Sequence, residues 1–418
     1  MTPRTPLLLL LVAGAAACSD GPSAPQAVPM PVLSVGGVFT CQLDADGQAT
    51  CWGANLWGQL GDDTGVECDQ NPCTPLPTPI APGVQFRGLS ASTASSIWSG
   101  HVCGISTDFT ALCWGVDHTQ LGQELESPEY CVAVNGLVGQ PCSRTPLAVP
   151  VPGRAVGIAS GDFHTCALTA DGALWCWGSD SNGQLGSTDD ELCGLYDLPC
   201  SFAPVRVSVD LPFVQVVAGA LHTCALAVNG TAYCWGRNDR GQLAHSGVEG
   251  GKVPGQAAGG MGFVTLTAGR RHTCGLTRDG AVWCWGDNSG GQLGNGTTVP
   301  TALERRVPVS TRFTQVSAGW WHTCALAETG IAYCWGSDVF GQLGSTLTEP
   351  ATCAEADPCN TRPLAVAAPT RFMAIGAGGA HTCAVDRSGA TYCWGDNSLG
   401  QLGTGDGQSS SQPVRVRG

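Results

Sequence analysis

The chain has 418 residues, including 59 glycines, 27 prolines and 23 cysteines, and its formal net charge is −14 at pH 7. The phosphate backbone of nucleic acid repels such an acidic chain, so the charge argues against a nucleic-acid partner. The abundant glycine and proline favour short strands joined by turns over long helices.

The N-terminal segment is typical of a secreted protein. Residues 1–17 combine Arg4, a short apolar stretch and small residues, which predicts a signal peptide too short to span a membrane. The small residues before Cys18 resemble a bacterial lipobox, so we expect a lipid on Cys18, with simple signal cleavage as the alternative. Residues 18–30 would then form a lipid-anchored flexible tether. These features predict an extracytoplasmic lipoprotein of the bacterial envelope, at the outer membrane, or a secreted protein.

A unit of about 50 residues or slightly more recurs seven times between residues 31 and 418. Each copy contains two cysteines ten positions apart, and the second is followed by Trp-Gly. Most copies close with Gly-Gln-Leu-Gly, as at residues 183–186. The chain is therefore a repeat protein and not a string of unrelated domains.

Each unit reads as four short strands. In the fourth copy, apolar alternation predicts strands at 204–207, 213–217, 222–226 and 232–235, with a glycine in the hairpin loop. Seven such units predict a seven-bladed β-propeller, because closing the ring protects the strand edges. We expect the C-terminal strand to close the ring by completing the first blade. A linear solenoid is the competing arrangement, but it requires capping units at both ends.

The repeated pattern is Ala-Gly-x-x-His-Thr-x-x-Leu, then Asp-Gly, then Trp-Gly-x-Asn/Asp-x-x-Gly-Gln-Leu-Gly. It resembles the repeat of the regulator of chromosome condensation family over about residues 31–418. The resemblance implies a single all-β, seven-bladed propeller domain. Some copies depart from the pattern: Phe39 replaces the histidine, Phe109 replaces the hairpin glycine, the glycine before Gln120 is missing, and Ala244 ends the fourth copy.

The two cysteines of each unit flank the hairpin loop symmetrically. Cys166 and Cys176 are centred on Asp171, so a three-residue loop at 170–172 makes them register partners within disulfide distance. Zinc binding through His-x-Cys, or reduced thiols, are the alternatives; in the resembled family the histidine occurs without cysteines, which implies a structural hydrogen bond. We expect no metal and no cofactor. The predicted disulfides, which leave only Cys18 over, are Cys41–Cys51, Cys103–Cys113, Cys166–Cys176, Cys224–Cys234, Cys274–Cys284, Cys324–Cys334 and Cys383–Cys393 in the hairpins, and Cys68–Cys73, Cys131–Cys142, Cys193–Cys200 and Cys353–Cys359 in the insertions.

The copies differ most in the connections that precede the histidine strand and follow Trp-Gly. In an antiparallel meander these two connections lie on the same face of the ring, and loops held on a rigid scaffold commonly carry function. Tryptophan and arginine are enriched at binding hot spots. We therefore expect a protein-binding patch on this face, with packing between blades as the alternative. Its predicted residues are Arg270, Arg271, Trp320, Trp321, Phe340, Phe163 and Trp57.

The sequence contains no recognisable nucleophile elbow or phosphate-binding loop, so we expect a binding protein rather than an enzyme. Within the resembled family, a secreted seven-bladed inhibitor of β-lactamases offers the functional analogy. It implies a monomeric interaction scaffold or inhibitor-like module with an unknown protein partner. A carbohydrate-active enzyme using the central channel is the alternative. Guanine-nucleotide exchange is implied only by the nuclear family member, and an extracytoplasmic protein would not meet a small GTPase.

Overall fold

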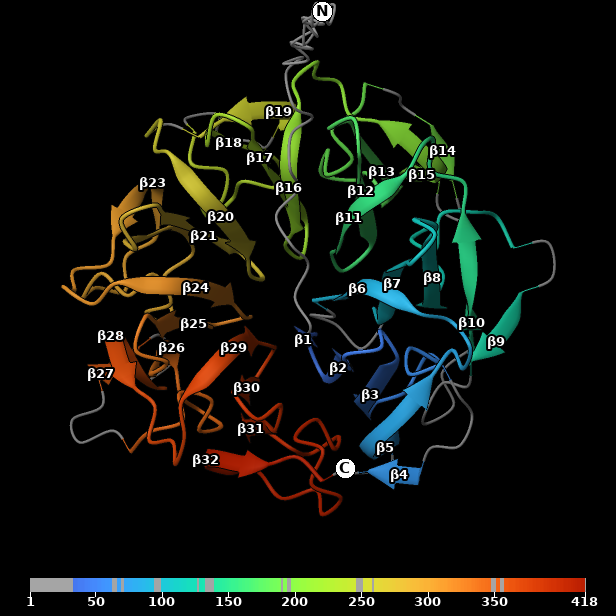
Figure 1. The fold of residues 1–418 in the computed structure, drawn as a ribbon. Coiled ribbons are helices and arrows are strands. Elements are labelled where there is room, and N and C mark those ends of the chain that lie inside the picture. The colour runs from blue at the N-terminus through green and yellow to red at the C-terminus, as the bar shows by residue number, and fades with distance from the viewer. Residues whose placement is uncertain are drawn as a thin grey trace, which may run out of the picture.

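The computed structural model describes residues 33–61, 66–68, 71–93, 99–125, 128–131, 139–188, 191–193, 197–245, 251–257, 259–346, 351–353 and 357–417. These residues form seven antiparallel sheets arranged as blades around a central axis (Figure 1). The predicted all-β, seven-bladed propeller is therefore confirmed. The expected signal peptide, Cys18 and the tether lie outside the described residues. In the described part of the chain, no helix has the length and apolar character needed to cross a bilayer.

Each blade is one continuous segment of the chain. Its strands are given below in their order in the sheet, from the innermost strand at the channel to the outermost. The first three blades are β1 (Leu33–Val35), β2 (Phe39–Leu43), β3 (Ala49–Ala54), β5 (Asn71–Ile80) and β4 (Val66–Cys68); β6 (Phe86–Ala91), β7 (His101–Ser106), β8 (Ala111–Val116), β10 (Gln140–Val149) and β9 (Glu129–Cys131); and β11 (Ala155–Ser160), β12 (His164–Thr169), β13 (Leu174–Ser179), β15 (Leu198–Arg206) and β14 (Leu192–Cys193). The fourth and fifth are β16 (Phe213–Ala218), β17 (His222–Ala227), β18 (Ala232–Gly236) and β19 (Gly251–Gln256), and β20 (Phe263–Ala268), β21 (His272–Thr277), β22 (Val282–Gly286) and β23 (Thr301–Arg306). The last two are β24 (Phe313–Ala318), β25 (His322–Ala327), β26 (Ala332–Ser337), β28 (Pro358–Ala365) and β27 (Ala351–Thr352), and β29 (Phe372–Ala377), β30 (His381–Asp386), β31 (Thr391–Gly395) and β32 (Ser410–Arg415).

The C-terminal strand does not complete the first blade, so that detail of the sequence prediction was wrong. β32 pairs with β31 inside the seventh blade, and the outer position of the first blade is already occupied by β5. The ring closes instead through contacts between the first and seventh blades, among them a backbone hydrogen bond from Gly379 N to Gly37 O at 2.9 Å. Trp52 Nε1 of the first blade donates to the carbonyl oxygen of Gln401 in the seventh at 2.9 Å. Leu33 and Trp52 also pack in one buried cluster with Leu402.

The Gly-Gln-Leu-Gly turn joins each blade to the next. Its glutamine carbonyl accepts a hydrogen bond from the Trp-Gly indole of the following blade at all seven junctions. Its leucine N–H is held by the Asn or Asp after Trp-Gly, as Asp180 Oδ1 accepts from Leu185 N at 2.8 Å. The indole donors are Trp52, Trp114, Trp177, Trp235, Trp285, Trp335 and Trp394, all buried, and the acceptors are Gln401, Gln59, Gln120, Gln184, Gln242, Gln292 and Gln342.

The repeated histidine is a second inter-blade contact. His164 Nε2 lies 2.9 Å from Thr223 Oγ1, and that hydroxyl donates to Gln184 O at 2.9 Å. The imidazole is therefore the donor to the threonine, and its Nε2 carries the proton. The structural hydrogen bond implied by the family resemblance is confirmed. It recurs as His101–Thr165, His164–Thr223, His222–Thr273, His272–Thr323, His322–Thr382 and His381–Thr40.

The remaining junction, between the first and second blades, has an apolar pair in place of this hydrogen bond. Phe39 occupies the histidine position of the first blade, and Val102 occupies the facing threonine position of the second. Both are fully buried in one core cluster. The two departures compensate for each other, since either polar group alone would be left without its partner.

The cysteines form the eleven predicted disulfides. Cys166 and Cys176 are directly opposed in the register of β12 and β13, with their Cα atoms 4.1 Å apart. Gly172 supplies the positive φ of 85° in the loop between them. The sulfurs that the zinc alternative requires are thus held in disulfides, and no metal-binding group of three His, Cys, Asp or Glu occurs within the described ranges.

We expect Gly219→Ala to destabilise the propeller by on the order of 3 kcal/mol, because a Cβ there overpacks a blade junction. That atom would lie 2.5 Å from the carbonyl oxygen of Gly269 in the next blade and would also collide with the His222 ring. Gly262→Ala is the matched control, since a Cβ there meets nothing within 4 Å. Guanidinium unfolding followed by tryptophan fluorescence measures both changes. Equal midpoints for the two variants would contradict this account of the junction.

Candidate functional site

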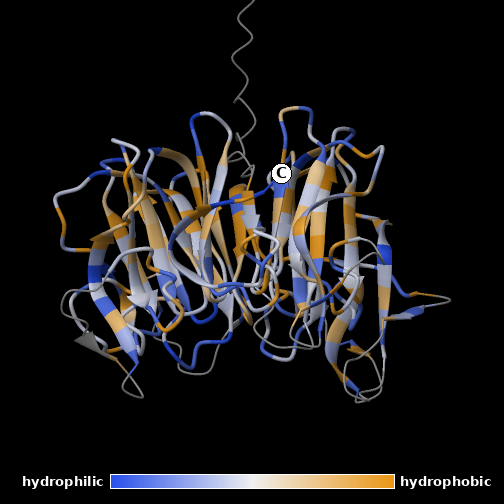
Figure 2. Ribbon diagram, turned by 90° about the horizontal axis from the view of Figure 1, so that it is seen from below, coloured by the Kyte–Doolittle hydropathy of each residue, from blue (hydrophilic) through white to orange (hydrophobic). Residues whose placement is uncertain are grey.

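In each blade, the connection between the first and second strands lies at the same end as the connection between the third and fourth. In the third blade the first of these follows Ser160, which pairs with Thr165, and the second follows Ser179, which pairs with Cys200. The strands cross the thickness of the ring, and the loops gather at its two ends (Figure 2). We call the end with these variable connections and the four disulfide-bonded insertions the variable face, and the end with the glycine hairpins the hairpin face. The predicted placement of the diverse loops on one face is confirmed.

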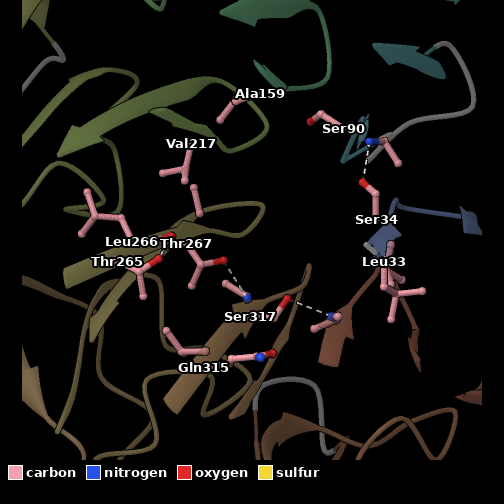
Figure 3. A pocket seen from close by; sticks show the side chains of 18 of the residues that line it. Leu33, Ser34, Ser90, Ala159, Val217, Thr265, Leu266, Thr267, Gln315 and Ser317 are labelled. Atoms are coloured by element: carbon pink, nitrogen blue, oxygen red, sulfur yellow. Dashed lines mark hydrogen bonds between the residues drawn. The ribbon is translucent and has the colours of Figure 1, made fainter. Parts of the chain in front are cut away.

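The central channel has a volume of about 700 Å³ and is lined by the innermost strand of every blade. Figure 3 shows part of this lining, including Ser34, Ser90 and Thr267. Its described lining consists of aliphatic, hydroxyl and amide side chains, glycines, Met373 and Trp320, and includes no Asp, Glu, Lys, Arg or His. Several polar groups join neighbouring blades: Ser34 Oγ accepts from Ala91 N at 2.8 Å, and Thr267 Oγ1 accepts from Ala318 N at 3.1 Å. The two carboxylates that glycoside hydrolysis generally requires are not among these residues.

Trp320 lies across the variable-face mouth of this channel. Its Nε1 donates to the carbonyl oxygen of Thr93 at 2.6 Å, which connects the sixth blade to the second. Gly379 of the seventh blade lies against the indole, because a Cβ there would be 2.8 Å from Trp320 Cε2. Thr93 in turn donates through its hydroxyl to Asp162 of the third blade. Trp320 is therefore a fixed part of the mouth, and packing accounts for this residue.

Arg270 and Trp321 form the centre of the predicted patch. The Arg270 guanidinium carbon lies 5.0 Å from the Trp321 ring centroid and 5.9 Å from that of Trp320, within the range of a cation–π interaction. Burial, together with the neighbouring positive charge of Arg271, lowers the pKa of Arg270, and the charge of Asp162 opposes that effect. The structure thus brings Arg270, Trp320 and Trp321 together beside the channel mouth, and the charge of Arg271 acts on Arg270.

The remaining predicted residues differ in accessibility. Phe340 is 48% exposed on the loop after β26, where a partner can reach it. Phe163 is half-buried, with its ring edge against His118 at 6.2 Å between centroids. Trp57 is only 3% exposed and packs against Val116 and the Cys131–Cys142 disulfide. The assignment of Trp57 to the binding patch was therefore wrong, because the second blade's insertion covers it.

Sequence reasoning missed three polar elements of the site. Asp162 immediately precedes Phe163 in the same variable connection, so its position was a usable signal. Arg237 and Asp239 form an ion pair at 2.7 Å on the loop after β18, which was also visible as a variable connection. Thr93 contributes a backbone carbonyl, and no residue pattern could have indicated that contact with Trp320.

The comparisons with known proteins agree with this architecture. The RCC1-like domain family matches residues 189–418, and the regulator of chromosome condensation (RCC1) repeat matches residues 155–184. The chain is 27% identical over 223 residues to RUG3, a mitochondrial RCC1 domain-containing protein of Arabidopsis thaliana; the match covers 53% of this chain but only 45% of RUG3. The structure is similar to human WBSCR16, with a TM-score of 0.74 at 20% identity over 89% of this chain and 95% of that one. It is also similar to yeast RCC1 (Prp20) solved in complex with Kap60, with a TM-score of 0.72 at 18% identity over 98% and 91% of the two chains. From the family match and the seven-bladed ring we conclude that the chain belongs to the RCC1-like domain family.

Proposed function

We propose that the protein is an extracytoplasmic, disulfide-bonded propeller that binds another protein through its variable face, as an interaction scaffold or an inhibitor-like module. The observation that carries the proposal is the aromatic and cationic cluster at the channel mouth. The Arg270 guanidinium of the fifth blade lies 5.0 Å from the Trp321 ring centroid of the sixth, and Phe340 is exposed on the next variable-face loop of the sixth blade. Such side chains dominate the energy of protein interfaces. The similar yeast RCC1 was solved with a protein, Kap60, bound to it.

The location outside the cytoplasm is supported by the eleven disulfides, because disulfides persist mainly in oxidising compartments. We further propose that the chain acts as a monomer and reaches the membrane only through a lipid on Cys18. Metabolic labelling with a palmitate analogue should then label the wild-type chain and not Cys18→Ala. Equal labelling of both would contradict lipidation at this residue.

The binding face is tested by site-specific photo-crosslinking. A benzoylphenylalanine at position 340 on the variable face should capture the partner from the native cell envelope. The same probe at Val228, which is 50% exposed on the hairpin face, is the matched control. We expect a crosslinked band that is specific to position 340 and that excess unlabelled protein abolishes.

Two outcomes would contradict the proposal. Equal capture from positions 340 and 228 would show that the variable face is not the binding surface. Absence of any specific crosslink at 340, in cells where the propeller is folded and oxidised, would remove the case for a protein partner at this face.

A further inference from the structure

Arg270 and Arg271 differ from the other half-buried arginines. Four arginines in the described ranges are half-buried: Arg144, Arg237, Arg270 and Arg271. Arg144 is paired with Glu129 at 3.0 Å, and Arg237 is paired with Asp239 at 2.7 Å. Within the described residues, neither Arg270 nor Arg271 has a carboxylate within 4 Å or donates a side-chain hydrogen bond. Partial burial of a cation without an anion is costly, so this arrangement requires an explanation.

Two tryptophans of the next blade lie close to the Arg270 guanidinium. Its central carbon is 5.9 Å from the Trp320 ring centroid and 5.0 Å from that of Trp321, and the Trp320 indole is held by a hydrogen bond to Thr93 O. A cation–π contact uses the face of the guanidinium, and its N–H donors, which lie in the guanidinium's own plane, remain available for hydrogen bonds. Trp320 also lines the channel, so Arg270 lies next to the channel mouth. β20–β21 and β24–β25, which carry these residues, belong to adjacent blades (Figure 1).

The nearby acidic groups do not neutralise the arginine pair. The negative charges of Asp162 and Asp287 favour the charged form of Arg270. Neither aspartate forms an ion pair with Arg270 within 4 Å. Asp162 also accepts from Thr93, and Asp239 is already paired with Arg237. Among the described residues, no carboxylate is therefore bound to the N–H donors of Arg270 or Arg271.

We propose that Arg270 and Arg271 form a receptor for a carboxylate presented by an acidic loop of the protein partner, with Trp321 as the adjoining apolar contact. This inference rests on the proposed function and specifies the chemistry of the same face. An arginine binds a carboxylate through two parallel hydrogen bonds, and partial burial strengthens them. Because the chain as a whole carries a charge of −14, its net charge repels an acidic loop at long range, and recognition depends on the short-range contact of that loop with the two arginines.

The test uses a capped peptide with the sequence Gly-Tyr-Asp-Glu-Tyr-Gly and its Asn/Gln isostere as probes. The side-chain N–H resonances of Arg270 and Arg271 are followed by NMR in the full oxidised propeller labelled with ¹⁵N-arginine. We expect saturable shifts with the acidic peptide and at least tenfold weaker binding of the isostere. Arg270→Gln with Arg271→Gln should weaken the acidic peptide at least tenfold. Arg240→Gln, an exposed arginine on a neighbouring loop, should leave it unchanged.

Three results would overturn the inference. The first is equal binding of the acidic peptide and its isostere, or no saturable shift with either. The second is displacement of the peptide by an equal concentration of inorganic phosphate, which would indicate a site for small anions and not for a protein loop. The third is an unchanged crosslink from position 340 in the double arginine variant. That result would leave the proposed function standing, whereas the absence of a crosslink in the wild-type chain would count against the proposed function itself.

Discussion

Acidification from pH 7.5 to pH 4.5 is expected to destabilise the propeller steeply, because six imidazoles are buried in the neutral form and hydrogen-bonded between blades. Burial lowers the pKa of His101, His164, His272 and His322 to about 3 and that of His222 and His381 to about 4. In the unfolded chain a histidine titrates near ~6.5. Between pH 6.5 and pH 4 these histidines are protonated in the unfolded state but not in the folded state. The free energy of unfolding is therefore highest above pH 6.5 and falls as the pH is lowered towards 4.

Two carboxyl groups oppose this loss. Burial raises the pKa of Asp117 and of Asp338 to about 6, so in the folded state they take up protons more readily than in the unfolded chain. They stabilise the fold below pH 6, and this contribution is lost as the pH rises through 6. Six protons against two leave a net of about four, or roughly 5 kcal/mol per pH unit at the steepest point between pH 4 and 6.

The measurement is the guanidinium midpoint of the oxidised protein at pH 7.5, 6.5, 5.5 and 4.5. The control is the double variant His322→Phe with Thr382→Val, which reproduces the Phe39 and Val102 pair that already occurs at one junction. This variant should take up one proton fewer on unfolding, so its stability should depend less steeply on pH, and it should keep the fold at pH 7.5. A midpoint that stays constant from pH 7.5 to 4.5 would refute the neutral, buried state of these histidines.

Local features of the fold could be predicted because they follow from sequence periodicity. The centre of symmetry between Cys166 and Cys176 gave both the hairpin register and the disulfide, since a three-residue loop allows only that pairing. The side of the ring on which each connection lies also followed, because antiparallel strands alternate in direction. The place of the C-terminal strand did not follow, since either grouping of strands into blades repeats equally well along the sequence.

Contacts across the ring could not be predicted in this way. Trp320 meets Thr93 although 227 positions separate them, and the acceptor is a backbone carbonyl. Trp57 looked like an exposed aromatic residue on a variable loop, but the insertion of the next blade buries it. Phe109 was visible as a departure at the hairpin glycine. Its positive φ of 71° and the arginines on its ring, Arg87 and Arg154 at 4.4 and 3.8 Å from the centroid, emerge only in three dimensions.

Complete reduction of the disulfides is expected to leave a chain that cannot refold at 37 °C. In the chain-entropy treatment, closing a ten-residue loop stabilises a fold by roughly 3 kcal/mol, so seven hairpin disulfides contribute roughly 20 kcal/mol. That exceeds the net stability of about 5–15 kcal/mol found for ordinary domains. Because the hairpin cysteines are fully buried, reduction needs denaturant, after which guanidinium is removed in the presence of dithiothreitol and refolding is followed by circular dichroism. The oxidised chain taken through the same dilution is the control and should regain its native spectrum.

Two double variants compare the stabilising effect of a hairpin disulfide with that of an insertion disulfide. Cys224→Ala with Cys234→Ala removes the hairpin disulfide, and Cys193→Ala with Cys200→Ala removes the insertion disulfide. The hairpin pair should cost about 3 kcal/mol or more, because it leaves a buried void between β17 and β18 as well as an unconstrained loop, and the insertion pair should cost less. A reduced chain that refolds with the midpoint of the oxidised one would show that the inter-blade hydrogen bonds and tryptophan packing alone suffice to hold the ring.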